Sequence, residues 1–147
     1  MTKHELAALL SSITPPDATA AHQFSERREH IVEQVDDLLL SRPDLDVLIG
    51  AFNRPQMHRN HRNHGLFMAA LFADYDADRL LATMLWVLPA YQAHGFRPDY
   101  WDVQLAAWQK TLAEVLDPDI WQQIAPIYAW MRDHLDTINA LGLAELT

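Results

Sequence analysis

Cysteine is absent from this chain of 147 residues, and glycine and basic residues are scarce. Without cysteine there is no disulfide, no thiolate metal ligand and no thioether attachment of a cofactor. Because 20 acidic side chains outnumber 11 basic ones, the net charge of -9 argues against binding to nucleic acid or to anionic membranes. No apolar run has the length of a membrane span or of a signal-peptide core. We therefore expect a soluble, cytoplasmic protein without membrane insertion.

Half of the residues are hydrophobic, and they recur at intervals of three and four, which is typical of amphipathic helices. No segment alternates with the period of two that indicates strands. Asn53, Asp76 and Asp117 are candidate N-terminal caps, and Pro89 should kink the helix that contains it. The predicted helices cover residues 3–12 (loosely packed or on a partner), 17–41, 43–49, 55–74, 76–94, 98–115 and 118–141. The sequence therefore predicts an all-α fold of about six to seven helices.

The stretch from Arg54 to Trp101 contains three histidines at a spacing of three: His58, His61 and His64. On a helix these side chains span an arc of about 120°, so adjacent pairs are close but all three cannot converge on one ion. Residues 53–64 contain arginine and histidine but no acid, which makes them the one locally basic segment. They form either a solvated polar face or an anion contact in which Arg59 or Arg62 pairs with a carboxylate.

Three segments resemble the globin domains of bacterial haemoglobins and flavohaemoglobins. Residues 38–45 (LLLSRPDL) resemble the passage from the B helix into the C helix, and residues 91–98 (YQAHGFRP) resemble the end of the F helix and the corner after it. Residues 101–118 resemble the G helix and the start of H. The resemblance implies a globin-like domain at 17–141, an N-terminal extension or short helix at 1–16, and a tail at 142–147.

The haem-contacting positions implied by this resemblance carry other residue types. The proximal histidine position is Tyr91, and His94 follows three residues later. The phenylalanine that packs against haem falls near Ile49, or is replaced by Phe52 from the loop, and the oxygen-binding tyrosine falls near Val35. A haem iron would therefore be ligated by His94 or by Tyr91 as a phenolate. A bilin would be held without a covalent bond.

The function expected from these patterns is ligand binding or sensing in a slot between the helices at 55–74 and 76–94. The ligand would be a tetrapyrrole, either haem or a bilin, or another amphipathic anionic molecule. The expected contacts are Arg59, Arg62, His61 and His64 at the mouth, Leu66, Phe67 and Met68 on one wall, and Val87, Tyr91 and His94 on the other.

Two alternatives remain open. One is a structural or interaction module that acts through a dimer or partner surface on the last two helices. The other is a haem-based gas-binding globin with an unusual axial ligand. The chain has no phosphate-binding glycine loop, no His-Glu-x-x-His and no serine elbow, so we expect no enzymatic activity.

Overall fold

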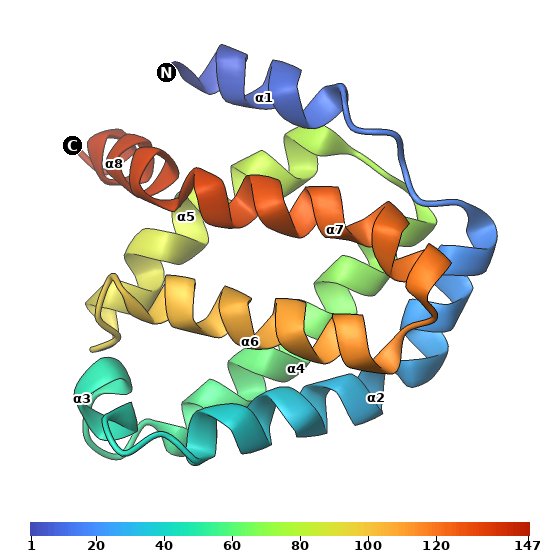
Figure 1. Ribbon diagram of the computed structural model, residues 1–147. Helices are drawn as coiled ribbons and strands as arrows, with labels where there is room; N and C mark the ends of the chain where they lie inside the picture. Colours follow the sequence, from blue (N-terminus) through green and yellow to red (C-terminus); the bar gives the residue numbers. More distant parts are fainter.

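The computed structural model describes all residues from 1 to 147, and it contains α-helices and no strands (Figure 1). The helices are α1 (Lys3–Ser11), α2 (Ala18–Leu40), α3 (Leu45–Ile49), α4 (Arg54–Ala73), α5 (Ala77–Ala93), α6 (Tyr100–Val115), α7 (Pro118–Asp133) and α8 (Leu135–Glu145). The all-α prediction is confirmed, although the structure has one helix more than predicted. The last helix is divided because the backbone leaves the helical conformation at His134, with φ -115° and ψ 14°. None of the helices combines the length and hydrophobicity needed to cross a membrane.

The long helix α2 lies at the base of the molecule in Figure 1 and packs against α4, α6 and α7. α6 and α7 run antiparallel, and α5 packs against α1 and α8. α4 and α5 make almost no close backbone contact, so side chains fill or line the space between them. The two chain ends lie side by side, with Lys3 Nζ 3.0 Å from Glu145 Oε1.

The N-terminal helix α1 belongs to the core, so the loose packing expected for it is wrong. Leu6 and Leu10 are completely buried in the same cluster as the core residues of the other helices. The hydroxyl of Tyr75 also donates a hydrogen bond of 2.9 Å to the carbonyl of Leu10. Burial of two leucine side chains stabilises the position of α1 against α5 by several kcal/mol, at about 1.5–3 kcal/mol each.

The candidate caps differ in what they bind. Asp76 caps α5 with its side chain, as predicted. Asn53 stands before α4 but makes no side-chain cap, because its backbone lacks the extended conformation that a cap requires. Its amide donates instead to the carbonyls of Ile49 at 2.7 Å and His94 at 2.9 Å, and it thereby joins the ends of α3 and α5. Asp117 also makes no cap, since its carboxylate binds side chains of α2.

Helix α5 continues through Pro89 and is assigned as one helix to Ala93. Pro89 has no N–H to donate to the carbonyl of Leu85, one turn earlier. Gly142 of α8 lies against that carbonyl so closely that a Cβ atom at position 142 would be 2.1 Å from the Leu85 oxygen. The close packing of α5 and α8 therefore depends on the absence of a side chain at position 142.

Candidate ligand-binding site

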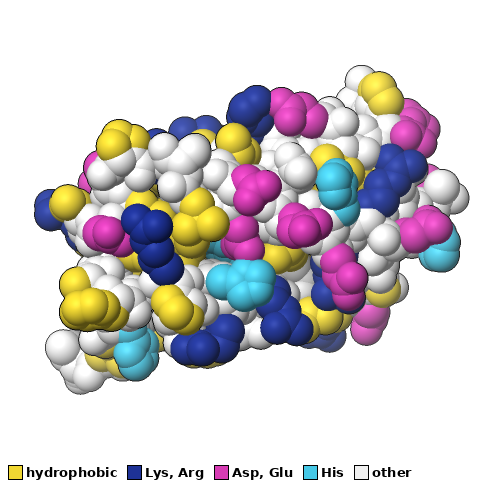
Figure 2. All heavy atoms as spheres, turned by 90° about the horizontal axis from the view of Figure 1, so that it is seen from below, with side chains coloured by type: hydrophobic (Ala, Val, Ile, Leu, Met, Phe, Trp, Pro, Cys, Tyr) yellow, Lys and Arg dark blue, Asp and Glu magenta, His cyan; other side chains and the backbone are white.

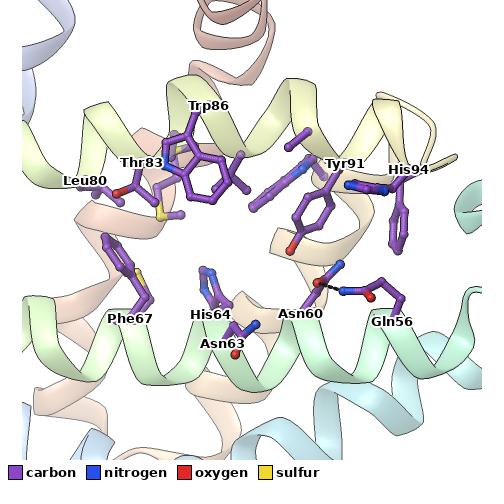
Figure 3. Close-up of a pocket in the computed structure, with 17 residues that line it drawn as sticks. Gln56, Asn60, Asn63, His64, Phe67, Leu80, Thr83, Trp86, Tyr91 and His94 are labelled. Carbon is purple, nitrogen blue, oxygen red and sulfur yellow. Dashed lines mark hydrogen bonds between the residues drawn. The ribbon is translucent and has the colours of Figure 1, made fainter.

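A cavity of about 390 Å³ lies between α4 and α5 (Figure 3). Of its 17 lining residues, 11 are hydrophobic, and none is Lys, Arg, Asp or Glu. This volume is near the lower end of the range for small-molecule sites, which are typically apolar with a few placed polar groups. The cavity is therefore suited to a small ligand that is mostly apolar and uncharged.

Two facing stripes of side chains form the walls of the cavity, as Figure 3 shows. Each stripe follows the helical spacing of three and four residues, which places its members on one face of the helix. The α4 stripe comprises Gln56, Asn60, Asn63, His64, Phe67 and Met68, and the α5 stripe comprises Leu80, Thr83, Met84, Trp86, Val87, Ala90, Tyr91 and His94. Phe96, Trp101 and Met131 complete the lining.

The structure brings six of the ten predicted contact residues to the cavity: His64, Phe67, Met68, Val87, Tyr91 and His94. Arg59, Arg62 and His61 do not line it, and Leu66 of the predicted wall is about half exposed. Arg59 lies one side chain away, because its guanidinium donates to Oε1 of Gln56 at 2.8 Å. The predicted arginine clamp for a carboxylate is therefore not formed inside the cavity.

His61 was predicted at the mouth, but it lies in the core and is completely buried. Its Nδ1 is 2.5 Å from Oδ1 of Asp36, and its Nε2 is 2.6 Å from the hydroxyl of Tyr100. A carboxylate only accepts, so Nδ1–H donates to Asp36, and Nε2 is left as the acceptor for the hydroxyl of Tyr100. Burial, together with the negative charge of Asp36, raises the pKa of Tyr100 and keeps its hydroxyl protonated.

His58 binds the same carboxylate from the solvent side, through a contact between its Nδ1 and Oδ2 of Asp36. Two histidines one turn apart on α4 thus bind the two oxygens of one carboxylate on α2. The interpretation of the three histidines as one solvated face therefore fails, because His58 is half exposed, His61 is buried and His64 lines the cavity.

The His64 ring is held from behind by α7 and α6. Its Nε2 is 2.9 Å from the hydroxyl of Tyr128, and its ring centroid is 4.5 Å from that of Trp108. Burial is the main cause that lowers the pKa of His64 to about 3. The imidazole that faces the cavity is therefore neutral at pH 7.

Tyr91 projects from the opposite wall, and its hydroxyl points across the cavity toward α4 (Figure 3). Its ring packs 4.9 Å from Trp101 and 5.2 Å from Phe96, measured between centroids. Burial raises the pKa of Tyr91, so the side chain is a neutral phenol. Phe52, which was considered as a haem contact, is 99% exposed and does not reach the cavity.

Several residues of the site were not identified from the sequence. The α4 residues Gln56, Asn60 and Asn63 lie on the stripe of His64 and Phe67, and extension of that stripe toward the helix start would have found them. Asp36 and Tyr128 have no such local signal, because they come from α2 and α7. Their contacts depend on tertiary packing alone.

No protein-family model, no curated protein and no solved structure matches the chain. The geometry and chemistry of the cavity are therefore the basis for a functional assignment.

Proposed function

We propose that the protein binds one small, mostly apolar and uncharged ligand in the cavity between α4 and α5, for carriage or for sensing. The main observation behind this proposal is that no Lys, Arg, Asp or Glu side chain lines the cavity of about 390 Å³. Apolar ligand surface is stabilised there by removal from water, whereas a buried charge without a counter-ion is costly.

The resemblance of the sequence to globin domains supports this location by analogy. By this resemblance, α2 and α3 would take the places of the B and C helices, and α4 and α5 would take those of E and F. Globins hold their ligand between E and F, and here the cavity lies between α4 and α5. The analogy favours this position as the binding site and does not select the ligand.

The lining does not fit a tetrapyrrole. Haem and bilins carry carboxylates, yet Arg59 and Arg62, the expected counter-ions, lie outside the cavity. The raised pKa of Tyr91 disfavours the phenolate that would bind ferric iron. His94, exposed at the end of α5, is then the one remaining iron ligand among those predicted.

Titration with N-phenyl-1-naphthylamine, a neutral apolar fluorophore, tests the proposal. We expect its fluorescence to rise and to saturate at one molecule per chain. Ala90→Phe should abolish this binding, because Ala90 lines the cavity and the larger ring fills it. Ala93→Phe is the matched control, since the same change is made on an exposed position of the same helix. Equal binding by both variants would place the site elsewhere.

Haemin and biliverdin test the tetrapyrrole alternative. We expect no Soret band that shifts and saturates at one per chain. A saturating band that is lost in His94→Ala and kept in Tyr91→Phe would instead establish haem binding through His94 and would overturn the preference for an uncharged ligand.

The interaction-module alternative has less support in the structure. No large hydrophobic side chain of α6 or α7 is exposed, and on α8 and the C-terminal end only Leu143 and Leu146 are. Figure 2 shows another face, on which acidic and basic side chains are interspersed and hydrophobic atoms gather toward one end. Failure of the fluorophore, haemin and biliverdin to bind would favour this alternative.

A further inference from the structure

We infer that the cavity selects ligands with an uncharged hydrogen-bond acceptor, such as a ketone or aldehyde oxygen. This inference rests on the proposed function, because it concerns the ligand of the same cavity. It follows from three polar side chains that line the cavity and carry a donor without a protein partner: Asn60 and His64 on α4 and Tyr91 on α5 (Figure 3).

The orientation of Asn60 is fixed by a chain of hydrogen bonds that starts at the surface. A guanidinium can only donate, so the 2.8 Å contact from Arg59 identifies Oε1 of Gln56 as the acceptor. The Nε2 group of Gln56 then donates to Oδ1 of Asn60 at 2.7 Å. The group of Asn60 that remains without a protein partner is its Nδ2 amide, which is a donor.

The proton position of His64 follows from its partner Tyr128. Tyr128 is completely buried, and burial raises its pKa, so its hydroxyl keeps a proton that needs an acceptor. Nε2 of His64 is the one hydrogen-bond partner of that hydroxyl. Tyr128 therefore donates to Nε2, and the neutral His64 ring carries its own hydrogen on Nδ1. Nδ1–H is a second donor without a protein partner.

The third donor is the hydroxyl of Tyr91, which is a neutral phenol and makes no hydrogen bond to the protein. In Figure 3 it points from α5 toward the stretch of α4 that carries Asn60 and His64. An acceptor oxygen on the ligand would satisfy donors from both walls. The oxygen should be uncharged, because no Lys or Arg side chain lines the cavity to compensate a buried carboxylate.

A matched pair of probes tests this inference: 2-acetylnaphthalene and 2-ethylnaphthalene, which have nearly the same shape and differ in one oxygen. Dissociation constants are measured by NMR titration of the full-length protein. We expect the ketone to bind about tenfold more tightly, the factor expected when a net hydrogen bond is added.

Tyr91→Phe removes one donor and keeps the ring, so it should reduce the preference for the ketone, measured as the ratio of the two dissociation constants. Tyr75→Phe is the control, because the Tyr75 hydroxyl binds the carbonyl of Leu10 outside the cavity. Equal affinities for the two probes would overturn the inference and leave the proposed function standing. Tighter binding of 2-naphthoate than of the ketone would overturn the inference and also the preference for an uncharged ligand. If neither naphthalene binds, the proposed function fails as well.

Discussion

Three histidines at equal spacing on α4 occupy three different environments, and the difference is set by residues on other helices. His58 and His61 share Asp36 of α2, whereas His64 is bound by Tyr128 of α7. A histidine kept neutral against a buried phenol titrates far from its ordinary range. This property can be measured as a dependence of stability on pH.

We predict that the free energy of unfolding decreases on acidification because of His64. In the unfolded chain its pKa is the ordinary 6.5, and in the folded protein it is about 3. Between these values the unfolded state binds the extra proton, so stability falls as the pH decreases below 6.5, by about 1.4 kcal/mol per pH unit. Relative to His64→Gln, the wild type should lose about 2 kcal/mol between pH 7.5 and pH 5, as measured by urea unfolding.

The control for this measurement is His4→Gln, which removes an exposed histidine of α1. An exposed side chain is solvated in both states, so this variant should keep the pH profile of the wild type. Parallel profiles for the wild type and His64→Gln would contradict the neutral state assigned to His64.

At the residue scale, the sequence predicts well which side chains can reach the cavity. It predicts less well which partner each polar side chain binds. The stripes through Phe67 and Val87 follow from helical spacing, which is local information. The burial of His61 could not be predicted, because its partners Asp36 and Tyr100 lie on α2 and α6. A polar side chain on a basic stretch is expected in water unless a distant partner compensates its burial.

At the scale of helices, α5 lacks one backbone hydrogen bond because of Pro89, and α8 has a glycine at the point where it packs against that part of α5. The carbonyl of Leu85 lacks its usual N–H donor because of Pro89, and Gly142 allows α8 to approach it. Helix spans were well predicted because apolar periodicity is strong. The break at His134 and the alternative role of Asn53 were not predicted, since both depend on contacts between elements.

We predict that Gly142→Ala destabilises the protein by about 2–4 kcal/mol, although alanine favours helix by up to about 1 kcal/mol. The added Cβ would lie 2.1 Å from a backbone oxygen, so α8 must move away from α5. Thermal unfolding should show a Tm lower by about 5–10 °C.

Gly65→Ala is the matched control, since its Cβ would meet side-chain carbons of Arg28 and Val32 at 3.2 Å. These side chains can adjust, so we expect a change of less than about 1 kcal/mol. Similar losses in the two variants would show that the approach of α8 to Leu85 is not the cause.

At the scale of the whole molecule, a single hydrophobic core connects α1 to the helices around the cavity. The core includes Leu6 and Leu10 of α1, and α1 packs on α5, the helix that forms one wall of the cavity. The composition and the apolar spacing of the chain predict a packed all-α protein, and the structure agrees. The integration of α1 could not be predicted, because the prolines after it suggest a separate segment.

We predict that Leu6→Ala lowers the free energy of unfolding by about 2–5 kcal/mol, the usual cost of removing a buried leucine side chain. Leu9→Ala, made on the same helix at a position that is nearly half exposed, should change it by less than about 1 kcal/mol. Urea unfolding at neutral pH measures both. If Leu6→Ala is as mild as Leu9→Ala, α1 is a detachable extension.

The contact between Pro89 and Gly142 has a consequence for recognising relatives of this chain. Each residue alone is unfavourable inside a helix, and together they mark the place where two helices distant in sequence approach through their backbones. We therefore expect a substitution at one position to change what is tolerated at the other, and relatives of this chain should carry proline and glycine at these two positions together.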